Sequence, residues 1–154
     1  MSYNVIKTEA SSERFKTFED LEVYKVARQL RRAMYEVTRR LPDFEKYDLA
    51  SQIRRAAVSL TNNIAEGHGR SHYPDQIRFF LHSRGSLEEL VNDLNVCSDE
   101  NYLPTSDILN LKEQAAEVLL LINGYLRYLR RRSTKAQEID DAHPEFSSVE
   151  DPLL

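Results

Sequence analysis

The chain has 154 residues, of which 41% are hydrophobic and 30% charged, and its formal net charge is −4. This length suits one domain with its own hydrophobic core and argues against two domains. A single cysteine, Cys97, excludes an intrachain disulfide and a cysteine-based zinc site, and four glycines are too few for glycine-rich phosphate loops. No apolar run is long enough to predict a membrane span, and the N-terminal residues lack the apolar core of a signal peptide, so we expect a cytoplasmic protein.

The negative charge is concentrated near the C-terminus. Residues 136–154 contain six acidic residues and no lysine or arginine, so this segment carries −6. The remaining residues carry +2, from 21 basic and 19 acidic residues. We therefore predict a flexible N-terminal segment at 1–16, a folded body at 17–132 and an acidic disordered tail at 133–154.

Two amphipathic helices are predicted in the first half of the body, because apolar residues recur there at spacings of three and four. The first, at about 18–40, precedes Pro42 and has the stripe Val23, Ala27, Leu30, Met34, Val37 and Leu41. The second, at about 47–66, has the stripe Leu49, Ile53, Ala56, Leu60 and Ile64. Gly67 and Gly69 follow the second helix, and we expect them to cap its C-terminus.

Two further helices follow with the same period. The third begins near Pro74, extends to about residue 100, and has the stripe Ile77, Phe80, Arg84, Leu87, Val91 and Leu94. The fourth extends from residues 104–106 to about residue 132, with the stripe Ile108, Leu111, Ala115, Val118, Ile122, Tyr125 and Leu129. The links are short and no segment alternates like a strand. The sequence therefore predicts an all-α fold, an antiparallel up-down-up-down four-helix bundle.

Two helices carry more apolar residues than one core stripe needs. The first adds Leu21, Tyr24 and Val26, and the fourth adds Leu119, Leu120, Leu121, Leu126 and Tyr128. Extra apolar surface on a bundle helix often binds another copy of the chain, so we predict a homo-oligomer. The alternative is a wider core stripe with a few exposed leucines.

A polar stripe accompanies the apolar one on the second helix. Its members are Gln52, Arg55, Ser59, Asn62 and Glu66, and the third helix adds Arg84, Ser86 and Glu89. Arg84 falls on the apolar row, where its guanidinium needs a carboxylate, and we expect Glu66 or Glu89 to supply it. We interpret these residues as a structural polar network that fixes helix register. A subunit interface, or a ligand or catalytic site on the charged members, is the alternative.

Three strings in these helices resemble those of a known family. Residues 18–25 read FEDLEVYK, residues 52–67 read QIRRAAVSLTNNIAEG and residues 84–90 read RGSLEEL. Over about residues 18–130 the chain resembles the bacterial four-helix bundle protein family, also called the 23S ribosomal RNA intervening-sequence protein family. The resemblance implies a bundle that assembles as a ring-shaped homopentamer. The related accessory proteins of diversity-generating retroelements imply a reverse transcriptase and nucleic acid as partners.

Basic residues form a second stripe on the first helix, with one aromatic among them: Lys25, Arg28, Arg32, Tyr35 and Arg39. Further arginines lie on the second helix and near the end of the fourth: Arg54, Arg127, Arg130 and Arg131. Because guanidinium groups bind phosphate well, we predict that these residues bind RNA or DNA. The alternative is a solvated face with local ion pairs, in which Glu36 would pair with Arg32 or Arg40 and Glu22 with Lys25.

Other chemistry has little support in the sequence. His68 and His72 have ligand-like spacing only on a helix, and Gly69 and Pro74 predict a loop there. The Glu-x-x-His pair of di-iron bundles is absent. We expect no metal, no cofactor and no catalytic residue. The predicted function is a non-enzymatic homo-oligomeric adaptor for RNA, DNA or a nucleoprotein; the alternative is a scaffold that contacts only proteins.

Overall fold

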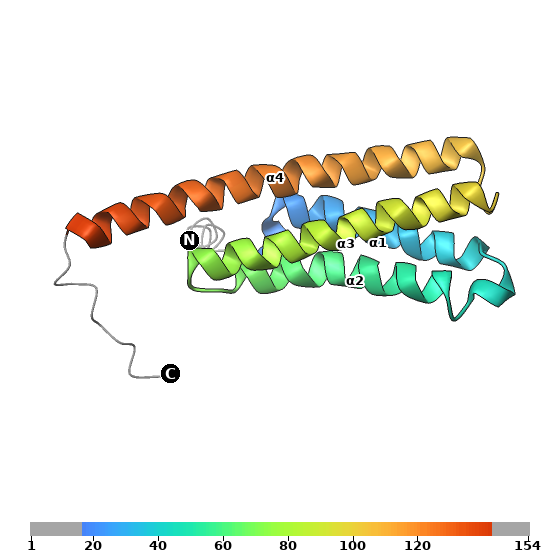
Figure 1. The fold of residues 1–154 in the computed structure, drawn as a ribbon, viewed down its shortest axis with the longest axis horizontal. Coiled ribbons are helices and arrows are strands. Elements are labelled where there is room, and N and C mark those ends of the chain that lie inside the picture. The colour runs from blue at the N-terminus through green and yellow to red at the C-terminus, as the bar shows by residue number, and fades with distance from the viewer. Residues whose placement is uncertain (1–16, 143–154) are drawn as a thin grey trace, which may run out of the picture.

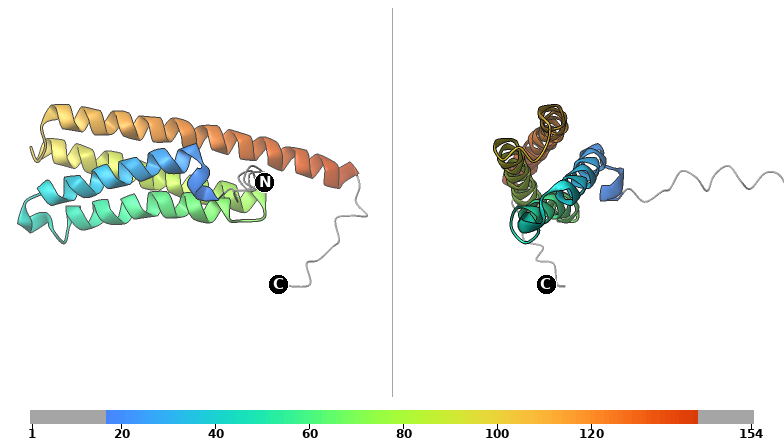
Figure 2. Two further views of the ribbon diagram at one scale, coloured as in Figure 1. Left: turned by 180° about the vertical axis from the view of Figure 1, so that it is seen from behind. Right: turned by 90° about the vertical axis from the view of Figure 1, so that its right-hand side faces the viewer.

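The computed structural model of the protein describes residues 17–142, which form four α-helices, two short 3-10 helices and no strand. The elements are η1 (Phe18–Asp20), α1 (Glu22–Arg40), η2 (Asp43–Glu45), α2 (Leu49–His68), α3 (Tyr73–Asp99) and α4 (Thr105–Ala142). Consecutive helices are antiparallel (Figure 1), and each helix packs against its two neighbours around the bundle axis, as the end-on view in Figure 2 shows. The predicted four-helix bundle is confirmed.

The core is built from the predicted stripes of α1, α2 and α4, whose members are buried apart from the half-buried Tyr125. The core face of α3 differs from the prediction. Ile77, Arg84 and Val91 are only half-buried, whereas the small polar residues Ser83 and Ser86 are buried. The buried face of α3 is therefore rotated, relative to the predicted stripe, toward Ser83 and Ser86 and so toward α2, the helix against which α3 packs most extensively.

Most of the extra apolar residues belong to a wider core. Val26 and Leu126 are buried, and Leu21, Tyr24, Leu119 and Leu121 pack against the core from its edge. Leu120 is 71% exposed, and Tyr128 is also exposed. The prediction of a homo-oligomer consequently depends on fewer residues than the sequence suggested. None of the helices between residues 17 and 142 has the length and hydropathy needed to cross a membrane.

Helix α4 is longer than predicted, because it ends at Ala142 rather than near residue 132. Residues 133–142, assigned above to the disordered tail, are helical. Good helix formers such as Ala136, Gln137 and Glu138 favour this extension, and Gln137 Nε2 donates to Asp141 Oδ1 one turn later at 3.2 Å. The predicted flexible segment at 1–16 and the rest of the tail, 143–154, lie outside the described residues.

Gly67 belongs to the last turn of α2 and not to its cap. A Cβ atom on this residue would lie 3.0 Å from Phe79 Cβ and 3.0 Å from Phe80 Cδ2, both in α3. The predicted capping role of Gly67 is therefore wrong: the glycine leaves room for α3 to approach. Gly69 is the C-cap as predicted, and its N–H donates to the carbonyl oxygen of Ala65 at 3.2 Å.

Gly67→Ala is expected to lower the free energy of unfolding by about 1–3 kcal/mol, because the added methyl group overpacks the contact between α2 and α3. Gly85→Ala is the matched control, since a Cβ there would meet nothing within 4 Å. In α3 the control should raise stability by about 0.5–1 kcal/mol through helix propensity. Urea denaturation followed by circular dichroism measures both, and a Gly67→Ala variant as stable as the parent contradicts the close-packing role.

Candidate nucleic-acid interface

The basic stripe of α1 lies on the side of the helix opposite its core residues. Lys25, Arg28, Arg32 and Arg39 are exposed, and Tyr35 is half-buried. The 3.6-residue period places these five residues on one face, while Leu30 and Met34 point into the bundle. The surface is hollowed along this row. A cavity of about 650 Å³ is lined by Lys25, Arg28 and Arg32 together with Glu19, Tyr24 and Gln29, and one of about 290 Å³ is lined by Arg31, Arg32, Tyr35, Glu36 and Arg39.

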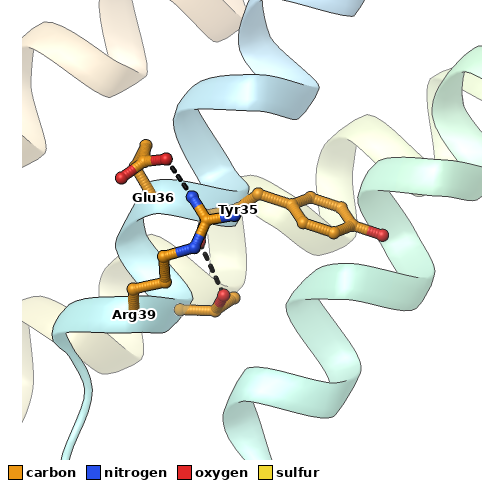
Figure 3. A network of polar contacts seen from close by, with 4 residues as sticks. Tyr35, Glu36 and Arg39 are labelled. Carbon is orange, nitrogen blue, oxygen red and sulfur yellow. Dashed lines mark hydrogen bonds and ion pairs between the residues drawn. The ribbon is translucent and has the colours of Figure 1, made fainter.

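Local ion pairs neutralise only one end of this row. Glu36 pairs with Arg39 (Figure 3) instead of with Arg32 or Arg40. Arg40 reaches across to α4, where its Nη2 lies 2.9 Å from Asp107 Oδ2. Within residues 17–142 no ion pair involves Lys25, Arg28 or Arg32. The predicted ion pairs of Glu36 with Arg32 or Arg40, and of Glu22 with Lys25, do not form among the described residues. Lys25, Arg28 and Arg32 therefore remain available to bind an anion.

Helix α2 extends the interface next to Tyr35. The Tyr35 ring points from α1 toward α2 (Figure 3), and a groove of about 510 Å³ lies between them. The groove is lined by Tyr35, Arg54, Arg55, Val58, Ser59, Asn62 and Asn63. The groove therefore brings together Tyr35 and Arg54, which are predicted to bind nucleic acid, and Arg55, Ser59 and Asn62, which are predicted members of the polar network.

Part of the predicted polar network joins α2 to α3. Ser59 Oγ and Ser86 Oγ are 2.7 Å apart, and Asn63 Nδ2 donates to Ser59 O at 2.9 Å and to Ser59 Oγ at 3.0 Å. The buried Ser83 hydroxyl donates to Leu60 O at 2.7 Å. Sequence reasoning missed Asn63 and Ser83. The sequence offers one indication for Ser83: it lies one helical turn before Ser86, which was predicted to belong to the network.

Two charged residues of the predicted network, Glu66 and Arg84, bind partners outside it. Glu66 Oε1 pairs with Arg70 Nη2 at 2.7 Å, just beyond the end of α2. Arg84 Nη1 donates to Asn123 Oδ1 of α4 at 3.1 Å. The predicted pair of Arg84 with Glu66 or Glu89 is therefore wrong. Arg84 lies on the side of α3 that faces α4, where the neutral amide of Asn123 accepts a hydrogen bond from its guanidinium.

Gln52, Arg55 and Glu89 lie around a separate cavity of about 370 Å³ between α2 and α3, which Asn92 and Asp93 also line. Asp93 is only 7% exposed. Burial, and secondarily the negative charge of Glu89, raise the pKa of Asp93 from its ordinary value of 3.8 to about 6. The ionised Asp93 carboxylate therefore destabilises the folded chain.

The cysteine and the histidines, the other residue types that could bind a metal or act as a nucleophile, do not form a site among the described residues. Burial is the main cause that raises the pKa of the Cys97 thiol to about 11, so the thiol stays protonated at neutral pH. His68 lies in the last turn of α2 rather than in a loop, and His72 is the N-cap of α3. Among residues 17–142, no three His, Cys, Asp or Glu side chains are grouped so that they could hold a metal ion.

The arginines near the end of α4 form a second cluster, in the part of the helix that approaches its projecting C-terminal end (Figure 1). Arg127, Arg130 and Arg131 are exposed. Arg132 lies over the Tyr128 ring, with its guanidinium carbon 5.4 Å from the ring centroid. The cavities of the α1 and α2 face are lined without these residues, so the structure does not join the two predicted basic regions into one site.

A comparison with protein families matches residues 19–124 to the family described as 23S rRNA-intervening sequence protein. This range covers most of the chain and includes α1, α2 and α3. The chain belongs to that family. A comparison with curated proteins found no match. The matched region contains all of α1, α2 and α3 and ends within α4, before Arg127.

Asp93→Asn is expected to stabilise this intervening-sequence protein at alkaline pH. The folded-state pKa of Asp93, about 6, exceeds its ordinary value of 3.8, so its stabilising contribution is complete below about pH 3.8 and is lost as the pH rises through 6. The asparagine stays neutral, so the free energy of unfolding should rise by about 1–2 kcal/mol at pH 8 and change little at pH 4.

Glu88→Gln is the matched control for this measurement, because Glu88 is an exposed acid on the same helix. Denaturant unfolding of both variants at the two pH values makes the comparison. An Asp93→Asn variant with the same gain at pH 4 and pH 8 would show that ionisation of Asp93 does not oppose folding.

Proposed function

We propose that this intervening-sequence protein is a non-enzymatic, homo-oligomeric adaptor that binds nucleic acid through the face formed by α1 and α2. The observation that carries the proposal is the row of three exposed cations, Lys25, Arg28 and Arg32, without an ion-pair partner among the described residues. A phosphate backbone supplies the complementary charge, and its contacts with lysine and arginine release condensed counterions. Binding of this kind is expected to weaken steeply as salt is added.

Self-association would strengthen this contact. A ring of identical chains repeats the cationic row by symmetry, and several weak contacts to one polyanion then add to high avidity. The apolar side chains that favour a second copy are Leu109, which is 58% exposed, and Leu120, which is 71% exposed, both on α4. These two leucines are three helical turns apart and leave α1 free for nucleic acid.

Replacing the cationic row should weaken binding selectively. For the triple variant Lys25→Gln, Arg28→Gln and Arg32→Gln, we expect the Kd for a 20-nucleotide RNA to rise about tenfold or more in low salt. The slope of log K against log salt should fall by about 2–3, one contact for each cation removed. Fluorescence anisotropy measures both quantities, with DNA of the same sequence as a second probe.

The matched control removes the same charge from other surfaces through Arg78→Gln, Lys112→Gln and Lys135→Gln, and should leave the Kd within about twofold. Equal losses in both triple variants would mean that only net charge matters. If the unmodified chain binds neither RNA nor DNA in low salt, the proposal fails and a scaffold that contacts only proteins explains the fold better.

Light scattering of the full chain should give a mass several times the 17.9 kDa of one copy. The pair of substitutions Leu109→Ser and Leu120→Ser is expected to lower that mass, because polar side chains remove the apolar contact. Phe44→Ser is the control: Phe44 is 70% exposed but lies in the link between α1 and α2. A monomeric parent chain contradicts the oligomeric part of the proposal.

A further inference from the structure

The groove between α1 and α2 combines three kinds of side chain that one ligand uses together. It contains an aromatic ring, Tyr35, two guanidinium groups, Arg54 and Arg55, and an exposed amide, Asn62. We infer that this groove is a subsite for one unpaired nucleotide of single-stranded nucleic acid. The inference deepens the proposed function and depends on it, because the row of cations on α1 would hold the neighbouring phosphates.

Tyr35 supplies the surface for the base. Its ring is half-buried and points toward α2 (Figure 3), next to the half-buried side chain of Val58. Glu36 and Arg39 form an ion pair on α1 (Figure 3), and Arg39 is not among the residues that line the groove. Bases stack on aromatic side chains whatever their sequence, since every base has a π-face.

Arg54 and Arg55 supply the charge for a phosphate. One guanidinium nitrogen of Arg54 donates to Lys46 O at 3.2 Å, which anchors the side chain while its other N–H groups can bind an anion. Arg55 is exposed and lines both this groove and the neighbouring cavity between α2 and α3, and no ion pair within residues 17–142 involves it. The groove thus places positive charge on the α2 side of the tyrosine ring.

Asn62 supplies hydrogen bonds to a base edge. Its side chain is exposed and makes no hydrogen bond with another described residue, whereas neighbouring Asn63 is occupied by both oxygens of Ser59. An amide both donates and accepts, as base edges do. A base can reach Tyr35 with its face and Asn62 with its edge only when it is unpaired, so the groove fits a single strand or loop and not the interior of a duplex.

The test compares a 12-nucleotide single-stranded RNA with a 12-base-pair duplex RNA by fluorescence anisotropy on the full chain. Tyr35→Ala is expected to weaken single-strand binding about tenfold, which is typical of one lost stacking contact, and to change duplex binding less than twofold. Tyr35→Phe should bind like the parent, because the ring is retained. Tyr128→Ala, which removes an exposed tyrosine beside an arginine on α4, should also bind like the parent.

Asn62→Ala gives an independent reading, since this exposed residue lies outside the core and its loss should not affect folding. It should weaken single-strand binding about threefold to tenfold. Equal affinity of the parent, Tyr35→Ala and Asn62→Ala for the single strand overturns the subsite, even where the lysine and arginine row proves essential. Absence of any RNA binding by the parent overturns the subsite together with the proposed function.

Discussion

The close approach of α2 and α3 is the constraint on which the rest of the structure depends. A methyl group at position 67 would lie 3.0 Å from Phe79 Cβ, so the two backbones can meet at this distance only around glycine. Further along the same contact, the Ser83 hydroxyl donates to Leu60 O and the Ser59 and Ser86 hydroxyls meet. Small residues and short hydroxyl side chains allow this separation, and large apolar side chains could not fill so narrow a space.

This contact decides which side of α2 is left for function. Ser59 and Leu60 are engaged with α3, whereas Arg55 and Asn62, which lie one turn before and one turn after Ser59 on the same stripe, are exposed. Helix α1 is fixed on the other flank of α2, where Arg31 Nη1 donates to the buried Thr61 hydroxyl at 2.9 Å. Tyr35 lies one turn after Arg31 and is thereby held at the edge of the α2 face. The proposed interface is thus a consequence of two packing contacts of α2.

The periodicity of apolar residues predicted the four helices and most of the core, because an amphipathic stripe is a local property of the sequence. The pattern was ambiguous for α3: Arg84 and Ser83 are adjacent, and only contact with α2 determines that Ser83 is buried while Arg84 turns to Asn123. The sequence predicted Tyr35, Arg54, Arg55 and Asn62 one by one as site or network residues. Which of them line one groove depends on how α1 and α2 are rotated relative to each other. No spacing within one helix could indicate that Tyr35 and Asn62 share a groove.

The most direct test of the central claim is an NMR titration of the full chain, with ¹⁵N-labelled arginine side chains, against single-stranded RNA. If nucleic acid binds the α1 and α2 face, the Nε resonances of Arg28, Arg32 and Arg55 shift in a salt-dependent way, while those of Arg78 and Arg130 stay in place. Shifts confined to the arginines of α4, or equal shifts of all arginines, would contradict binding at this face.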